Sequence, residues 1–311
     1  MTDAIDATKQ AFIELDHNHA SLPLRTPIEI PAENGLSLFM PAYLPELDQL
    51  GIKVASIFPN NSEKDIPAIT GVVLLLDSKT GAPKALLDAS YLTALRTGAS
   101  SGVATDLLAK PDAKQLAIIG AGAQAKTQLS AVLAVRDITD IAIYSRSHQS
   151  RELFAGYIKE KYKDLQVTIA DAIDSACHDA DIICTATNST EPLVYLDDIK
   201  DDCHINAIGS HNESMHEIDI SVIKQAKVIV DQKHASLKEA GEIIRAIKAK
   251  LIEDDDLLEL GYILNHQNHY IELKQQLTVF KSVGIAIQDL TVASKALELA
   301  EADDIGTMVS I

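Results

Sequence analysis

A short glycine-rich stretch combines residue types and spacing that can bind phosphate groups. The apolar run at residues 116–119 ends in Gly120-Ala-Gly122-Ala-Gln-Ala125, and a helical pattern of apolar residues follows it. Gly120 permits a tight turn, Gly122 lets the backbone approach a pyrophosphate, and the small Ala125 lets the helix pack on the strand. The free N–H groups of the helix N-terminus then face the phosphates. We therefore predict a dinucleotide-binding turn, with an ordinary glycine turn of an α/β domain as the alternative. The residues expected to contact the cofactor are Gly120, Gly122, Ala123 and Gln124.

The tip of the next predicted strand indicates which dinucleotide binds. In the usual NAD site, an acidic side chain at this tip accepts hydrogen bonds from the ribose 2′-OH. Here residues 141–144 are followed by Ser145-Arg146, and Asp140 stands at the wrong end of the strand. Ser145 and Arg146 are suited to a 2′-phosphate, which a guanidinium binds well. The sequence therefore favours NADPH, with NADH possible and a plain surface arginine as the alternative.

Composition excludes several classes of partner. The 311 residues include 27 basic and 45 acidic side chains, which give a net charge of −18. This charge argues against nucleic acid and against an anionic membrane surface. No apolar run approaches the roughly 18 residues that a membrane-spanning helix needs, and the acidic start does not resemble a signal peptide. We expect a cytoplasmic protein.

Cysteine and histidine spacing gives no reason to expect a metal. Cys177, Cys184 and Cys203 are odd in number and lack metal-ligand spacing, so reduced thiols are the simple interpretation. His17 and His19 are interpreted as a solvated helix end rather than a metal-binding pair. The prediction is that no metal is bound.

The predicted cofactor-binding residues follow different strands, so they can meet only if these strands end at the same edge of one sheet. Near-continuous apolar runs are typical of parallel strands buried on both faces, so we predict an α/β fold with a Rossmann-type, doubly wound parallel sheet. The expected strands are 115–119, 141–144, 166–170, 181–186, 204–208 and 227–231, with a further strand-like piece at 277–280. Residues 236–260 are expected to be a helical region whose acidic run at 253–256 is solvated.

The N-terminal part is expected to be an α+β domain. The sequence predicts a first helix at 2–19, an antiparallel or mixed sheet, and a long helix at 91–110 capped by Ser90. The sheet strands are expected at 25–30, 36–40, 52–57 and 71–76. The amphipathic helix at 285–301 should return to pack on this domain. The predicted division is 1–111 with 285–311 for the first domain and 112–284 for the dinucleotide-binding domain.

Four motifs together resemble a known family. They are Met40-Pro-Ala-Tyr-Leu44 with Gly51-Ile-Lys-Val54, Leu92-Thr-Ala-Leu-Arg-Thr-Gly98, Ile118-Ile-Gly-Ala-Gly-Ala-Gln124, and Thr278-Val-Phe-Lys-Ser-Val-Gly284 with Asp289. The chain resembles the ornithine cyclodeaminase/μ-crystallin family over nearly its whole length, and most closely its ketimine reductase and Δ1-pyrroline-2-carboxylate reductase branch. The resemblance implies a nicotinamide cofactor, a small imino-acid or amino-acid substrate, and a homodimer formed through the N-terminal substrate domain.

The resemblance also implies a clamp for the substrate carboxylate on Arg25, Lys53 and Arg96. The residues suit this role, because Lys53 stands in an apolar strand and Arg96 on a largely apolar helix, where an unpaired charge is costly. Lys53 is also a catalytic candidate, since a lysine beside an imine can transfer a proton. The alternative is that each cation pairs with a protein carboxylate or reaches water.

His211 marks a departure from the cyclodeaminases that the chain resembles. Those proteins carry an acid after the fifth strand, whereas the matching stretch here is Ile208-Gly-Ser-His211. Ornithine cyclisation needs oxidation, loss of ammonia and reduction in one site, so this change argues against it. His211 remains a catalytic candidate that can donate a proton or orient the substrate, or it is a plain loop histidine. The nicotinamide end is expected near Ala186 and Thr187, and near Val283 and Gly284.

The resulting hypothesis is NADPH-dependent reduction of a small cyclic imine carboxylate. Δ1-Pyrroline-2-carboxylate, giving L-proline, is the first choice, and Δ1-piperideine-2-carboxylate, giving L-pipecolate, is the second. One alternative is an ornithine cyclodeaminase or an alanine or other amino-acid dehydrogenase. Another is a non-catalytic NADPH-dependent ligand-binding protein of the crystallin type.

Overall fold

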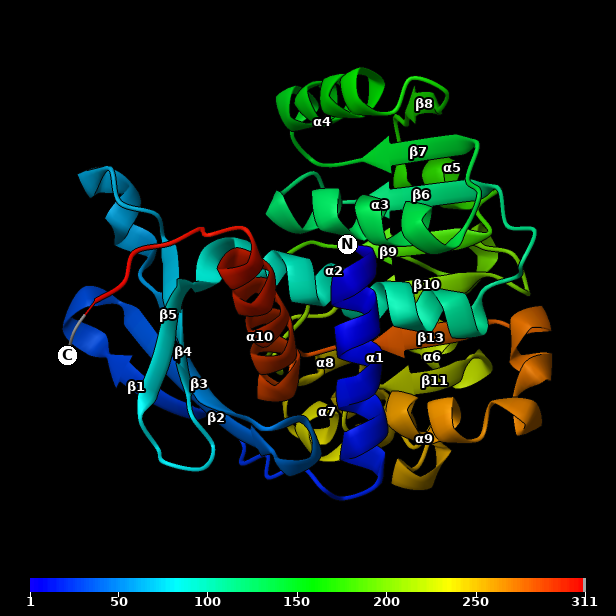
Figure 1. Cartoon of the computed structure of the whole chain (residues 1–311). Helices are drawn as coiled ribbons and strands as arrows, with labels where there is room; N and C mark the ends of the chain where they lie inside the picture. Colours follow the sequence, from blue (N-terminus) through cyan, green and yellow to red (C-terminus); the bar gives the residue numbers. More distant parts are fainter. Residues whose placement is uncertain (310–311) are drawn as a thin grey trace.

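A computed structural model describes residues 1–309, except for the side chains of residues 62 and 63 (Figure 1). Within these residues the chain forms two sheets. One has five strands in the order β1-β2-β3-β4-β5, and the other has eight in the order β12-β11-β13-β10-β9-β6-β7-β8. Every pairing in the larger sheet is parallel, and every pairing in the smaller sheet is antiparallel.

The larger sheet confirms the predicted doubly wound architecture. From β6 the chain proceeds outward to β7 and β8, then returns to the other side of β6 with β9. Ligands bind at such a reversal of strand order, at the carboxyl ends of the strands. Strands β9, β10 and β13 are buried along their whole length, which explains their apolar runs. The strands are β6 (Gln115–Ile119), β7 (Asp140–Tyr144), β8 (Gln166–Ile169), β9 (Ile182–Thr185), β10 (His204–Ala207), β11 (Lys227–Val230), β12 (Leu258–Glu259) and β13 (Thr278–Lys281).

Short helices connect these strands. They are α3 (Ala123–Val135), α4 (His148–Lys161), α5 (Ile173–Cys177), α6 (Ile220–Gln225), α7 (Lys233–Glu239), α8 (Gly241–Lys248) and α9 (Leu260–Asn265). The predicted helical region at 236–260 is instead several pieces, because Ala240 adopts an extended conformation between α7 and α8. The acidic run at 253–256 is exposed, as expected, and contains the 3-10 turn η5 (Asp254–Asp256).

The smaller sheet and three helices form the other half of the molecule. The elements are α1 (Thr2–Asp16), β1 (Thr26–Ile30), β2 (Gly35–Leu44), β3 (Gln49–Ile57), β4 (Ile69–Leu76), β5 (Pro83–Asp88), α2 (Ala89–Leu108) and α10 (Ala286–Ala302). Strand β5 was not predicted; its Pro83 and Lys84 gave a weak strand pattern. The prediction that Ser90 caps α2 was wrong, because Asp88 is the cap and its Oδ1 accepts from the Ser90 backbone N–H at 2.9 Å.

Helix α10 returns from the larger sheet to the smaller one. It packs on α1, α2 and strands β2–β4, and Figure 1 shows it between the five-stranded sheet and α1. The predicted return of the last helix is thus confirmed. The exact domain division, 1–111 with 285–311 and 112–284, stays a prediction, and residues 310 and 311 lie outside the described residues. No helix in the described part of the chain is both long enough and apolar enough to cross a membrane.

Candidate active site

The glycine turn has the geometry of a phosphate cradle. Gly120 has φ +114°, and a Cβ there would lie 2.5 Å from the Ala186 carbonyl oxygen, so only glycine fits. Gly122 is the N-cap of α3, and a Cβ there would meet nothing within 4 Å. The space before the helix N-terminus is therefore open, which leaves room for a phosphate to approach the backbone N–H groups.

A cavity of about 560 Å³ opens from this turn along the carboxyl edge of the large sheet. Three strand ends supply most of its walls: residues 119–122 after β6, 144–146 after β7 and 186–189 after β9. The structure thus brings together six of the predicted cofactor residues, namely Gly120, Gly122, Ser145, Arg146, Ala186 and Thr187. The glycine turn and the residues at these three strand ends suit a dinucleotide.

The rim at the tip of β7 carries a positive charge. Arg146 is exposed, and its Nη2 donates to Asn188 Oδ1 at 3.3 Å. None of the described residues that line the cavity is an aspartate or glutamate. Asn188 was not predicted, although it directly follows the predicted pair Ala186-Thr187 and the strand-end rule covers it equally.

A second cavity, of about 360 Å³, joins the first to the smaller sheet. Its lining includes Lys53 from β3, Ala123 and Gln124 from the start of α3, and Gly122 and Ala186, which also line the first cavity. The buried Oε1 of Gln124 accepts no hydrogen bond within the described chain. An unpaired buried amide oxygen is costly, and a bound ligand can satisfy it.

Two of the three predicted cations meet on one carboxylate. Asp289 Oδ1 accepts from Lys53 Nζ at 2.9 Å and from Arg96 Nε at 3.1 Å, and all three side chains are buried. Arg96 Nη1 also donates to Gln288 Oε1 at 2.8 Å. One negative charge therefore faces two positive charges, and this excess suits an anionic ligand.

The third predicted cation, Arg25, is bound to the segment that precedes α10. Arg25 Nη2 donates to the Gly284 carbonyl at 2.6 Å and to the Val283 carbonyl at 3.1 Å, and it forms an ion pair with Glu239 at 2.8 Å. Gly284 has φ +79°, and a Cβ there would strike the guanidinium of Arg96. Each predicted cation thus has a protein carboxylate partner, which was the alternative left open by the sequence.

The pKa of Lys53 depends on the charges of both other cations. The pKa of Lys53 is lowered from 10.5 to about 8: burial is the largest cause, the charges of Arg96 and Arg25 act in the same direction, and Asp289 opposes them. A lysine with this pKa is charged at neutral pH yet gives up its proton readily. Lys53 can therefore attract a carboxylate and also exchange a proton.

His211 follows β10 and lies near the cations but lines neither large cavity. Its Nδ1 donates to the Gly209 carbonyl at 3.1 Å. Because a carbonyl only accepts, the proton is on Nδ1 and Nε2 presents a lone pair. The His211 side chain is partly accessible to solvent, but the protein around it displaces much of the water, and this lowers the pKa of the ring. The positive charges of Arg25, Lys281 and Arg96 lower the pKa as well.

Several polar residues at the site were given no role by the sequence. Asp289 and Gln288 are fully buried on α10, where a charged residue inside an apolar pattern was the available signal. Asp231 is also fully buried, and its Oδ2 accepts from the backbone N–H groups of Val283 and Gly284 at 3.0 and 2.8 Å. It thus holds in place the segment predicted to contact the nicotinamide.

A separate histidine pair lines neither of these two cavities. His17 and His19 are exposed at the end of α1, and His19 Nδ1 lies 3.0 Å from Glu14 Oε2. One potential ligand atom from each of the three residues lies within 4.8 Å of the others. Exposed clusters of this kind are common without an ion, and the expectation that no metal binds stays a prediction.

The fold and the site define a dinucleotide-binding α/β protein in which a buried basic pocket adjoins the glycine turn. More particularly, the chain belongs to the ornithine cyclodeaminase/mu-crystallin family, whose family model matches residues 1–303. The resemblance seen in the motifs is thus confirmed.

Individual relatives are similar over nearly the whole chain. The Δ1-pyrroline-2-carboxylate reductase of Bacillus cereus strain ZK / E33L is 39% identical over 311 residues, covering 99% of this chain and 95% of the relative. The structure of the Thermococcus litoralis Δ1-pyrroline-2-carboxylate reductase with NADH and L-proline has a TM-score of 0.93 and 38% identity, covering 98% of this chain and 95% of that one. An archaeal alanine dehydrogenase dimer with bound NAD has a TM-score of 0.90 and 29% identity, covering 100% and 95%.

Proposed function

We propose that this protein reduces a small cyclic imine carboxylate with a nicotinamide cofactor, and that its first substrate is Δ1-pyrroline-2-carboxylate, which gives L-proline. The observation that carries the proposal is the pair Lys53 and Arg96, which share one carboxylate oxygen beside the cavity that leads to the glycine turn. The similarity to the Bacillus and Thermococcus reductases supports the choice of substrate.

In the proposed mechanism the cations hold and activate the substrate. Arg96 and Lys53 bind its carboxylate, since Asp289 neutralises only part of their charge, and Arg25 adds a third positive charge nearby. The Lys53 ammonium then protonates the imine nitrogen, which makes the C=N carbon a better electrophile. The bound nicotinamide supplies the hydride. Holding the substrate in a fixed geometry contributes much of the rate.

His211 is proposed to orient the substrate. Its neutral ring presents Nε2 as an acceptor, so it can receive the N–H of the protonated imine. A histidine in this role replaces the acid that the cyclodeaminases carry at the matching position. Cyclisation of ornithine is therefore not expected.

Steady-state assays test the function directly. The purified protein is supplied with NADPH or NADH and with Δ1-pyrroline-2-carboxylate or Δ1-piperideine-2-carboxylate, and parallel reactions contain NAD with L-ornithine or L-alanine. We expect fast reduction of the five-membered imine and no ammonia from ornithine. Turnover of ornithine or alanine in place of the imines would refute the proposal. Tight NADPH binding with no turnover of any substrate would instead favour a ligand-binding protein.

The preferred cofactor is proposed to be NADPH. Arg146 and Ser145 line the rim of the cofactor cavity, where no described residue offers a carboxylate to the ribose. Replacing Arg146 by Ala should raise the KM for NADPH about tenfold and leave the KM for NADH nearly unchanged, since only NADPH carries the 2′-phosphate. The control is Lys159→Ala, which removes an exposed charge on α4. Equal effects on both cofactors, or a wild-type preference for NADH, would contradict the assignment.

The proposed assembly is a homodimer formed through the face of the smaller sheet that points away from α10. Helix α10 packs on one face, and Figure 1 shows none of the helices α1, α2 and α10 on the other. Apolar side chains share that face, including Ile28, Val72 and Leu86, which are 50%, 39% and 68% exposed. Exposed apolar patches of this kind mark protein interfaces, and the alanine dehydrogenase relative is a dimer.

The proposed location is the cytoplasm. Cys177, Cys184 and Cys203 are all free and buried, and burial raises the pKa of each thiol. Free thiols of this kind are usual in a reducing compartment.

A further inference from the structure

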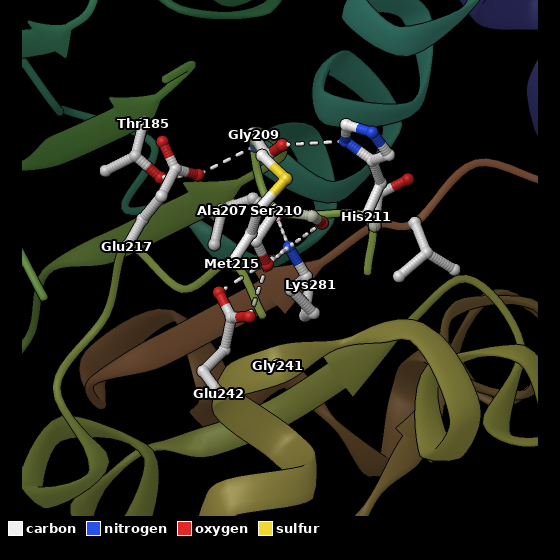
Figure 2. Close-up of polar contacts among 12 residues, drawn as sticks. Thr185, Ala207, Gly209, Ser210, His211, Met215, Glu217, Gly241, Glu242 and Lys281 are labelled. Carbon is white, nitrogen blue, oxygen red and sulfur yellow. Dashed lines mark hydrogen bonds and ion pairs between the residues drawn. The ribbon is translucent and has the colours of Figure 1, made fainter. Parts of the chain in front are cut away.

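Glu217 joins the ends of two neighbouring strands at the site. Its side chain is fully buried, its Oε1 accepts from the Thr187 backbone N–H at 2.6 Å, and its Oε2 accepts from the Gly209 backbone N–H at 2.7 Å and from Thr185 Oγ1 at 2.9 Å (Figure 2). A Cβ at Gly209 would collide with this carboxylate and with the Thr187 carbonyl. The ends of β9 and β10 are thus pinned at a fixed separation.

Lys281 holds the same loop from another side. It is fully buried at the end of β13, and its Nζ donates to the Ser210 carbonyl at 2.7 Å, to Ser210 Oγ at 2.8 Å and to the Ala207 carbonyl at 3.2 Å. Ser210 Oγ in turn donates to Glu242, which lies 3.5 Å from Lys281 Nζ. Figure 2 shows this network beneath the loop, with His211 projecting away from it.

Burying these charges is costly unless every polar atom is paired. Here Glu217 accepts from the backbone N–H groups of residues 187 and 209, and Lys281 donates to the carbonyls of residues 207 and 210. These residues lie at the carboxyl edge of the sheet, where the cofactor cavity also lies. Fixed dipoles and charges of this kind hold a site without reorganisation during the reaction.

We propose that Glu217 and Lys281 are positioning residues that fix the backbone of residues 209–211 and thereby set the place of the His211 imidazole beside the basic pocket. The inference rests on the proposed function, because His211 is proposed to orient the substrate in that reaction. Neither residue touches the substrate; both act through His211 and Thr187.

The chain provides a matched control for Glu217. At the opposite, amino end of the same sheet, Asp181 Oδ2 accepts from the backbone N–H groups of Lys114 and Gln115 at 2.8 and 3.0 Å. The two carboxylates therefore make the same type of contact at opposite edges of the sheet. Asp181→Asn should lower the melting temperature and leave kcat, KM and the His211 titration unchanged.

Glu217→Gln retains the shape but cannot accept all three donors. We expect kcat for the imine to fall at least tenfold, with a smaller change in KM. We also expect the pKa of His211, followed by NMR without cofactor, to rise toward its ordinary value as the ring moves into solvent. Ser210→Ala removes the hydroxyl between Lys281 and Glu242 and should cause the same changes to a smaller extent. If Glu217→Gln does not fold, the Ser210→Ala variant alone tests whether the network positions His211.

The proposal is overturned if Glu217→Gln and Ser210→Ala keep both the wild-type kcat and the wild-type His211 titration. It is also overturned if Asp181→Asn reduces kcat and shifts the titration equally, because the effect is then one of general stability. If the wild-type protein reduces no cyclic imine, the proposed function fails. The His211 titration then still decides whether Glu217 and Lys281 position the loop.

Discussion

At the scale of single residues, the site depends on an imbalance of charge. Lys53 and Arg96 share one oxygen of Asp289, and the other oxygen, Oδ2, has no hydrogen-bond partner in the described chain. A buried cation pair with one anion remains short of negative charge, so a carboxylate ligand is stabilised there more than at an exposed lysine. Burial is the main cause of the low pKa of Lys53, and the neighbouring charges of Arg96 and Arg25 lower it as well.

This imbalance predicts a pH dependence. The pKa of Lys53 is about 8 instead of 10.5, so the charged form is present below about pH 8 and is lost above it. We expect kcat/KM for imine reduction to fall as the pH rises through about 8, measured between about pH 7 and pH 10.

The control for this titration is Lys53→Arg, which stays charged throughout the range. Any pH dependence that remains in this variant comes from the titration of the imine substrate and not from residue 53. If Lys53 donates the proton, the variant keeps a KM close to that of the wild type but loses kcat. A profile identical in the variant and the wild type would refute the role of Lys53.

The residue types of the site could be inferred from the sequence, but their pairings could not. Arg25, Lys53 and Arg96 were expected near one another, and the charges of Arg25 and Arg96 both lower the pKa of Lys53. Their carboxylate partners Asp289 and Glu239 are separated from them by almost 200 residues or more, so no local pattern indicates the contact. Such pairs depend on the tertiary fold, which a single sequence does not reveal.

At the scale of elements, α2 and α3 join the two halves of the site. Helix α2 carries Arg96, α3 begins at the glycine turn, and the helices approach so closely that a Cβ at Gly98 would lie 2.6 Å from the Thr127 carbonyl oxygen. The sequence predicted both helices from their apolar periodicity. It did not predict β5 or β12, because a proline-containing strand and a two-residue strand have almost no local signal.

Gly98→Ala should therefore separate the two helices. We expect a loss of about 1–3 kcal/mol in the free energy of unfolding, measured by urea denaturation, because a backbone oxygen cannot move aside as a side chain can. Gly156→Ala on α4 is the control: it is exposed, a Cβ there meets nothing within 4 Å, and it should stabilise by up to about 1 kcal/mol. Equal effects of the two substitutions would contradict this packing argument.

At the scale of the whole molecule, the smaller sheet presents a partly exposed apolar face on the side away from α10. Val54, Val72 and Phe39 lie opposite one another on neighbouring strands of that face, and Ile52, Leu74 and Leu86 form the next row. A monomer would leave these rows in water. A second copy of the chain, placed face to face, would bury them.

Introducing negative charge into this face should separate the dimer. The double variant Val72→Glu/Leu86→Glu is expected to weaken association on the order of 100-fold, because a two-fold interface brings four carboxylates together. The control Leu153→Glu/Ile271→Glu adds the same charge at sites that are 68% and 64% exposed elsewhere. Sedimentation velocity over a concentration series gives the dissociation constants. A monomeric wild type, or equal weakening in both variants, would refute the proposed interface.

The return of α10 to the first half of the molecule has a consequence for synthesis on the ribosome. Lys53 and Arg96 are made early, but their shared partner Asp289 lies near the end of the chain. While the chain is still growing, these two cations have no counter-charge, and the face of the small sheet that α10 will cover is bare. The first half therefore cannot reach its native packing until α10 has emerged. A chain that stops before α10 keeps the glycine turn but lacks the carboxylate that holds Lys53 and Arg96 together.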